Sequence, residues 1–186
     1  MKADRFFRQS PSGLPGLPPH TPPNVNFGPP SGATAILMLV GLIGLCLLAG
    51  AAGGAVTQQN LYPWYESLTR PPGVPPNEAF GPIWTTLDVA MGVAAWRVWR
   101  RAGRGRILWL WGWQLGVNAA WPPVFFGLHA LAPAIAVIVA LWVLISLTIR
   151  AFARVDGLAA LLMAPYLAWV SYAAYLNAGF WWLNRM

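Results

Sequence analysis

The chain has 186 residues, of which 57% are hydrophobic and only 9% are charged, and its formal net charge is +7. An ordinary soluble domain carries about 25% charged residues, so this composition argues against a soluble enzyme or a disordered chain and for an integral membrane protein. A single cysteine, Cys46, excludes a disulfide within the chain.

Residues 1–33 form a segment of different composition, with eight prolines and four glycines. Proline removes backbone donors and glycine adds chain entropy, so little in this segment favours a packed core. The sequence therefore predicts a disordered, proline-rich cytoplasmic tail with local polyproline II character. It precedes a transmembrane domain over residues 34–186.

Five apolar segments follow the tail, and each has roughly the 20 residues that a helix needs to cross about 30 Å of hydrocarbon. They run over residues 33–56, 79–99, 107–128, 130–152 and 157–183. Strands of about 10 residues with alternating polarity, as in a membrane β-barrel, are absent from the sequence. We therefore predict an all-α membrane protein, a five-transmembrane-helix bundle.

The basic residues predict the orientation of this bundle. With five spans, the N-terminal segment and the second and fourth connections share one side, and ten of the twelve Lys and Arg residues fall there. Only Arg70 and Arg185 fall on the other side. The positive-inside rule places the N-terminus in the cytoplasm and the C-terminus outside it. Helical spans predict an inner (cytoplasmic) membrane, since outer-membrane spans are normally barrels. Topology thus explains most of the net charge, and no nucleic-acid partner is predicted.

Tryptophans near the ends of the apolar segments are expected to form belts at the membrane surface. These residues are Trp96, Trp99, Trp109, Trp111, Trp113, Trp181 and Trp182.

The longest ordered connection covers residues 57–78 and is rich in proline and aromatic residues. Long, stiff loops tend to be functional, so this one is a candidate lid on the non-cytoplasmic end of the bundle.

Three predicted helices carry stripes that mix aromatic with polar side chains at helical spacing. The stripes are Trp84, Asp88, Met91 and Ala95; Gln114, Asn118, Trp121 and Phe125; and Tyr166, Trp169, Ala173 and Asn177. One interpretation is helix packing through hydrogen bonds and aromatic contacts. The other is a tapering cavity under the long loop, suited to a flat apolar ligand such as a porphyrin, or to a sterol.

No catalytic or metal-binding constellation stands out. His20 and His129 have no second ligand at metal spacing, so no metal site, no catalytic residues and no obligatory cofactor are predicted. In the first helix Gly50 and Gly54 form a GxxxG pair, which serves either packing within the bundle or dimerisation.

The motifs together resemble the TspO/translocator protein family of tryptophan-rich sensory proteins. The resemblance begins with Trp64-Tyr65, Arg70-Pro71, Pro75-Pro76 and Trp84-Thr85, continues with Gln114, Asn118 and Trp121, and ends with Tyr166, Trp169, Asn177 and Asn184. It covers about residues 34–184, including all five predicted helices in order.

The resemblance implies a bundle, commonly a homodimer, that binds porphyrin or haem and in some members a sterol or lipid. It implies that the loop over residues 57–78 caps the pocket. Together with the stripe residue Asp88, the positions that match the family's pocket give a ligand-binding set of nine residues: Trp64, Tyr65, Pro76, Trp84, Asp88, Asn118, Trp121, Trp169 and Ala173.

Two positions in the membrane segments depart from the family pattern. Asp88 stands where an aromatic residue is usual, and a carboxyl in mid-helix is protonated, paired or facing a wet cavity. Pro122-Pro123 doubles the proline of the third helix and is expected to kink it.

Three hypotheses for function follow. The first is a membrane sensor or carrier for tetrapyrroles with a regulatory role and no enzymatic activity. The second is light-dependent degradation of a bound porphyrin, or sterol and lipid transport. The third is a signalling scaffold that acts through the arginine-rich connection and the proline-rich tail.

Overall fold

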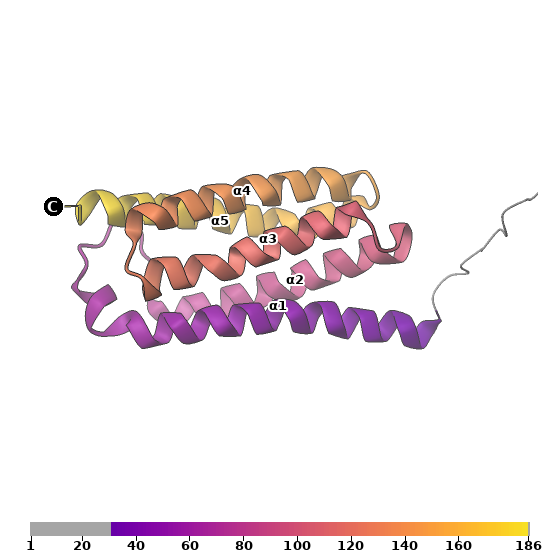
Figure 1. Cartoon of the computed structure of the whole chain (residues 1–186), viewed down its shortest axis with the longest axis horizontal. Coiled ribbons are helices and arrows are strands. Elements are labelled where there is room, and N and C mark those ends of the chain that lie inside the picture. Colours follow the sequence, from indigo (N-terminus) through magenta and orange to yellow (C-terminus); the bar gives the residue numbers. More distant parts are fainter. Residues whose placement is uncertain (1–30, 186) are drawn as a thin grey trace, which may run out of the picture.

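The computed structural model describes residues 31–185, and in this part of the chain all regular structure is helical. Five long helices run side by side along one direction (Figure 1). Their bounds are α1 Gly32–Asn60, α2 Asn77–Ala102, α3 Arg106–Pro122, α4 Leu131–Ala153 and α5 Gly157–Leu183, and two π-helical turns, η1 Leu61–Tyr65 and η2 Pro123–Gly127, extend α1 and α3. The predicted tail over residues 1–33 falls almost entirely outside the described residues.

The fifth predicted segment agrees with α5, but the first ends too early, because α1 continues through residues that we assigned to the loop. Polar side chains on this last part of α1 bond back to its own carbonyls: Thr57 Oγ1 donates to Gly53 O at 2.9 Å, and Asn60 Nδ2 to Val56 O at 2.8 Å. The helical path breaks only at Tyr62 (φ −116°, ψ 137°), since the following Pro63 favours an extended residue before it. The irregular connection to α2 is therefore shorter than predicted.

The double proline changes the path of the chain where the sequence predicts it. Because proline has no backbone N–H, the α-helical hydrogen bonding of α3 ends at Pro122, and the turn η2 follows. The N–H of Leu128 then bonds the carbonyl of Pro123 at 2.8 Å, which closes a wider turn.

Three helices of the described part are long and apolar enough to cross a membrane: α1 with η1 (Gly32–Tyr65), α4 and α5. Large apolar side chains on α1 and α4, including Leu37, Leu48 and Val143, face outward from the bundle, as expected of surfaces in contact with lipid. The protein is thus an integral membrane protein. α3 has only 17 residues before its π-helical turn, and α2 carries three arginines in its last turns, so five spans remain a prediction.

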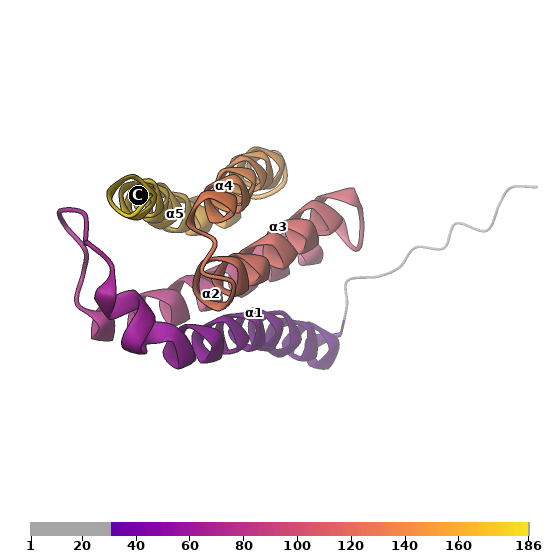
Figure 2. The same ribbon diagram turned by 60° about the vertical axis from the view of Figure 1, so that its left-hand side comes forward.

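The helices pack in layers, with α1 against α2 and α3 on one side and α4 with α5 on the other (Figures 1 and 2). The buried residues of α4 follow a spacing of four, three and four residues along one stripe: Ala134, Ile138, Leu141, Ile145, Thr148 and Phe152. Such a stripe keeps one face of a straight helix against its neighbours.

Glycines allow α1 to lie very close to α2 and α3. A Cβ atom on Gly92 of α2 would lie 2.7 Å from the Cα atom of Ile43, and one on Gly53 would lie 2.8 Å from the Pro122 ring. A Cβ on Gly50 would overlap the Asp88 carboxyl, whereas one on Gly54 would meet nothing within 4 Å. Of the two GxxxG glycines, Gly50 therefore serves packing within the bundle.

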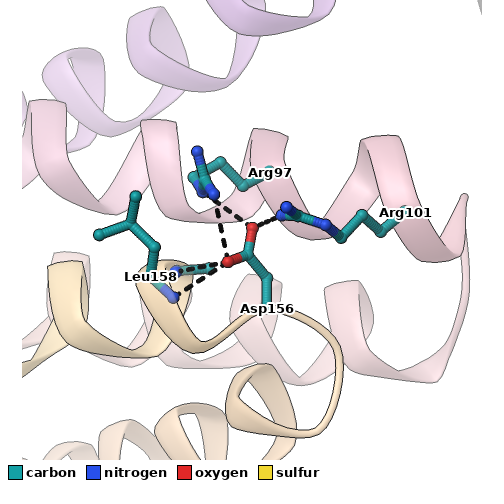
Figure 3. Close-up of polar contacts among 5 residues, drawn as sticks. Arg97, Arg101, Asp156 and Leu158 are labelled. Atoms are coloured by element: carbon teal, nitrogen blue, oxygen red, sulfur yellow. Dashed lines mark hydrogen bonds and ion pairs between the residues drawn. The ribbon is translucent and has the colours of Figure 1, made fainter.

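The connections α2–α3 and α4–α5 lie at the same end of the bundle (Figure 1), which brings the arginines of residues 97–106 and 150–154 together. Asp156 joins α2 to the start of α5 (Figure 3). Its carboxylate accepts from Arg97 Nε at 2.8 Å, pairs with Arg101, and caps α5 by accepting from the N–H groups of Leu158 and Ala159. We call this the basic end.

The predicted belt at the basic end is wrong for Trp111, because its side chain is only 4% exposed and packs in the core. Trp109 and Trp113 on the same helix are exposed, as a belt requires. A helix that faces a neighbour on one side places only some of its tryptophans outside, and a count of tryptophans near a helix end does not reveal which.

Candidate functional site

A cavity of about 510 Å³ lies in the half of the bundle away from the basic end. Residues of α1, η1, α2, α3, η2 and α5 line it, and α4 contributes none of the described lining. On α2 the lining runs from Asn77 to Asp88, which at 1.5 Å per residue corresponds to a depth of about 16 Å. This volume is within the range of about 300–1,000 Å³ that is typical of small-molecule sites.

Three indoles from three helices line this cavity: Trp84 of α2, Trp121 of α3 and Trp169 of α5. The rings of Trp84 and Trp169 meet edge to face, with centroids 6.4 Å apart and an interplanar angle of 88°. Trp121 stacks on Phe125 at 4.9 Å, and its Nε1 donates to Asn177 Oδ1 at 3.1 Å. The stripes predicted from helical spacing thus converge on one space, and the aromatic residues present rigid surfaces to it.

The connection between α1 and α2 covers the outer end of the cavity. Tyr65 is buried there, with its ring 5.4 Å from that of Phe126 and 5.2 Å from that of Phe180. Arg70 lies over the Tyr65 ring and pairs with Glu66 at 2.7 Å. Tyr65 therefore forms the roof of the site.

Residues 69–73 of this connection are fastened to α5. The Asn184 side chain accepts from the N–H of Thr69 at 2.9 Å and donates to the Thr69 carbonyl at 3.0 Å. The Tyr172 hydroxyl donates to the carbonyl of Gly73, and a Cβ on Gly179 would lie 2.6 Å from Pro71. We call residues 68–76 the lid; these contacts hold it against α5, and none of its residues lines the cavity.

Polar groups are few in the cavity, and three buried polar atoms of its lining residues have no hydrogen-bond partner among the described residues. These are Oδ1 of Asn77 and Oδ1 of Asp88, both acceptors, and Nε1 of Trp169, a donor. Asp88 is 2% exposed, and its other oxygen packs against Gly50. Asn118 contributes an amide from α3. An unpartnered polar atom in a buried site is costly unless something else satisfies it.

A packed layer closes the cavity toward the basic end. Gln114 donates from Nε2 to the Met91 sulfur and to the Tyr166 hydroxyl, both at 3.3 Å, and all three side chains are fully buried. Gln114, Met91 and Tyr166 belong to the predicted stripes, but they do not line the cavity. They form its floor.

Seven of the nine predicted ligand-binding residues line the cavity: Tyr65, Trp84, Asp88, Asn118, Trp121, Trp169 and Ala173. Trp64 and Pro76 are not among its lining residues. Trp64 packs against Phe125 and Phe126 and stacks on the ring of His129 at 4.1 Å. His129 Nε2 also lies 3.1 Å from Asn60 Oδ1. Trp64 therefore supports Tyr65 indirectly, because both rings pack against Phe126.

Sequence reasoning missed several lining residues that come from α1 and from the start of α2. Gly50 and Gly53 make room for the cavity wall, Gln58 lies in the segment assigned to the loop, and Phe80 meets Trp169 at 6.1 Å. A helical projection of the extended α1 would have placed Gln58 two turns beyond Ala51. The contact of Gly50 with Asp88 cannot be predicted from the sequence of either helix alone, because it depends on how α1 packs against α2.

In residues 31–185, no three His, Cys, Asp or Glu side chains come together as a metal site would require. The cavity therefore offers aromatic surfaces, one carboxyl and a few amides, which suit binding of an organic molecule.

The fold and the cavity define a helical membrane protein with an internal space for a small molecule. The sequence model of the TspO/MBR family matches residues 42–183. The chain is 41% identical over 146 residues to the tryptophan-rich protein TspO of Chlorobaculum tepidum (76% of this chain, 92% of the relative). It is 40% identical over 143 residues to protein CrtK of Rhodobacter capsulatus (75% and 88%) and 36% identical over 152 residues to the translocator protein of Bos taurus (79% and 90%). The chain belongs to the TspO/MBR family.

Proposed function

We propose that the chain is a membrane receptor or carrier for tetrapyrroles such as protoporphyrin IX or haem, with a regulatory role. The cavity walled by Trp84, Trp121 and Trp169 is the observation that carries this proposal. Three indoles on separate helices offer flat surfaces to a flat ring, and stacking of a porphyrin on aromatic side chains needs few polar contacts. The names sensory protein and translocator protein, carried by relatives, agree with a sensor or carrier.

The proposal includes five spans in a cytoplasmic membrane, with the basic end in the cytoplasm. The clustered arginines support this orientation through the positive-inside rule. The lid then faces the opposite side. Homodimer formation and sterol binding remain predictions from the resemblance.

The test is a titration of the detergent-purified protein with protoporphyrin IX, followed by quenching of tryptophan fluorescence. We expect saturable quenching in the wild type and at least a tenfold higher Kd in the variant Trp84→Ala/Trp169→Ala, because both lining rings are lost. The matched control is Trp109→Ala/Trp182→Ala, which removes two exposed indoles and should leave Kd unchanged. Linear quenching that is equal in all three proteins would refute binding in the cavity.

The same complex separates binding from the photochemical alternative. If the protein only binds, the porphyrin absorbance of the complex under light decays no faster than in empty detergent. Faster decay with new product bands, lost in the Trp84→Ala/Trp169→Ala variant, would instead establish turnover in the cavity.

The contacts between the lid and α5 are expected to slow the release of a bound ligand, so weakening them should speed release. We expect Tyr172→Phe/Asn184→Ala to raise the dissociation rate of protoporphyrin IX about tenfold, since it removes the three side-chain hydrogen bonds from Tyr172 and Asn184 to the lid, each of which contributes about 0.5–1.5 kcal/mol, and the exposed ones the least. Stopped-flow recovery of tryptophan fluorescence measures this rate. Trp142→Phe, which removes a hydrogen bond to Ser171 away from the cavity, is the control. An unchanged rate in the double variant would show that the lid does not gate release.

A further inference from the structure

Asp88 is a carboxyl in the middle of α2, at the deep end of the cavity lining, and nothing in residues 31–185 pairs with it. Its side chain is 2% exposed, and Oδ1 accepts no hydrogen bond. The first arginine on the same helix is Arg97, nine residues or about 13 Å further along the axis. The Arg97 guanidinium is already bound to Asp156.

The glycine at position 50 of α1 makes room for the Asp88 carboxyl. Gly50 of α1 leaves the space that the Asp88 carboxyl occupies, because any Cβ there would overlap it. Asn118 on α3 and Trp169 on α5 also line the cavity. Asp88 therefore lies at the inner end of an aromatic-walled cavity, and its carboxyl has no ion pair or hydrogen-bond donor among the described residues.

An unpartnered carboxyl in an apolar site favours one kind of ligand over the others. A protonated amine supplies both an opposite charge and N–H donors to the Asp88 carboxyl, and such charge-assisted hydrogen bonds are the strong ones. A neutral group satisfies the oxygen less well, and a carboxylate at the same place is repelled. The aromatic walls also suit a cation, since indole faces attract positive charge.

We propose that Asp88 makes this cavity selective for apolar ligands that carry a protonated amine at the end that reaches the floor. This inference rests on the proposed role of the cavity as the ligand site, and it adds a second ligand class to the tetrapyrroles. It also fixes how an acidic tetrapyrrole lies, with its carboxylates toward the lid and away from Asp88.

The test uses three matched fluorescent probes, each a dansyl group on a six-carbon chain that ends in an ammonium, a hydroxyl or a carboxylate. In the wild type we expect the ammonium probe to bind at least tenfold more tightly than the hydroxyl probe, and the carboxylate probe to bind most weakly. Trp84→Ala/Trp169→Ala should abolish saturable binding of all three, which assigns the signal to the cavity.

The decisive variant is Asp88→Asn, which keeps the size of the side chain and removes its charge. We expect the ammonium and hydroxyl probes to bind Asp88→Asn within about twofold of each other. Asp88→Ala, which needs less space beside Gly50, should give the same loss of preference and covers the case in which the amide does not fit. Glu78→Gln is the control, because it makes the same charge change at an exposed position of α2 outside the lining.

Equal binding of the ammonium and hydroxyl probes to the wild type would overturn the proposal, as would an unchanged preference in Asp88→Asn and Asp88→Ala. Protoporphyrin IX, titrated in parallel, separates this failure from failure of the proposed function. Saturable porphyrin binding without amine preference refutes only the role of Asp88. Amine preference without porphyrin binding supports Asp88 and refutes the tetrapyrrole assignment.

Discussion

Replacing Asp156 with alanine is expected to lower the free energy of unfolding by about 2–4 kcal/mol. The change removes the cap of α5, which contributes about 1 kcal/mol. It also leaves Arg97, whose side chain is 25% exposed, without its carboxylate partner. Breaking a fully buried pair costs about 3–5 kcal/mol, and the partial exposure of both arginines reduces that figure.

Two further variants separate the cap from the ion pairs. Asp156→Asn keeps a capping side chain and loses the charge, so we expect about half of the destabilisation. Arg101→Gln should cost less than about 1 kcal/mol, because the Arg101 side chain is 49% exposed. Unfolding of the purified protein by increasing SDS in mixed micelles measures all three. Wild-type stability of Asp156→Ala would show that the contacts in Figure 3 do not hold α5 to α2.

Replacing Gly92 with alanine is expected to destabilise the bundle by about 1–3 kcal/mol, as overpacking of a tight contact does. The added Cβ would lie 2.7 Å from the Cα atom of Ile43 and 2.8 Å from its N atom. Backbone atoms cannot move aside as a side chain can, so α1 must shift away from α2. Because Gly50 meets Asp88 one turn along α2 from Gly92, the same shift should also lower the affinity for protoporphyrin IX.

The matched control is Gly44→Ala in α1, where a Cβ would meet nothing within 4 Å. Alanine is preferred over glycine in a helix by up to about 1 kcal/mol, so this variant should be neutral or more stable. The same chemical change is thus expected to have opposite signs at the two positions. SDS unfolding checks the stabilities, and fluorescence quenching checks the affinity. Equal effects at both positions would contradict the close approach of α1 to α2.

Local pattern was enough to predict much of the fold and of the cavity lining. The bounds of α5 were predicted correctly because its apolar run has no charged residue from Gly157 to Leu183. Trp84, Asn118, Trp121 and Trp169 were placed on inward stripes by the helical period alone. The resemblance added Tyr65, which lies in a segment without a regular period.

What remained hidden depends on how separate helices meet. The contact of Gly50 with Asp88 is set by the vertical register of α1 against α2, which neither helix determines alone. Trp64 was assigned to the pocket as part of a motif with Tyr65. Both rings pack against Phe126, but Trp64 stacks on His129 whereas Tyr65 packs against Phe180. Arg97 and Arg101 were counted only as orientation signals, although Asp156 engages both.

The layer of Met91, Gln114 and Tyr166 beneath the cavity makes the site a blind pocket in this conformation. A molecule that enters has to leave on the side from which it came. Passage from one leaflet to the other would require these three side chains to separate and their two hydrogen bonds to break. This conformation suits retention of a molecule in the cavity, and a vectorial cycle would need a second arrangement of α2, α3 and α5.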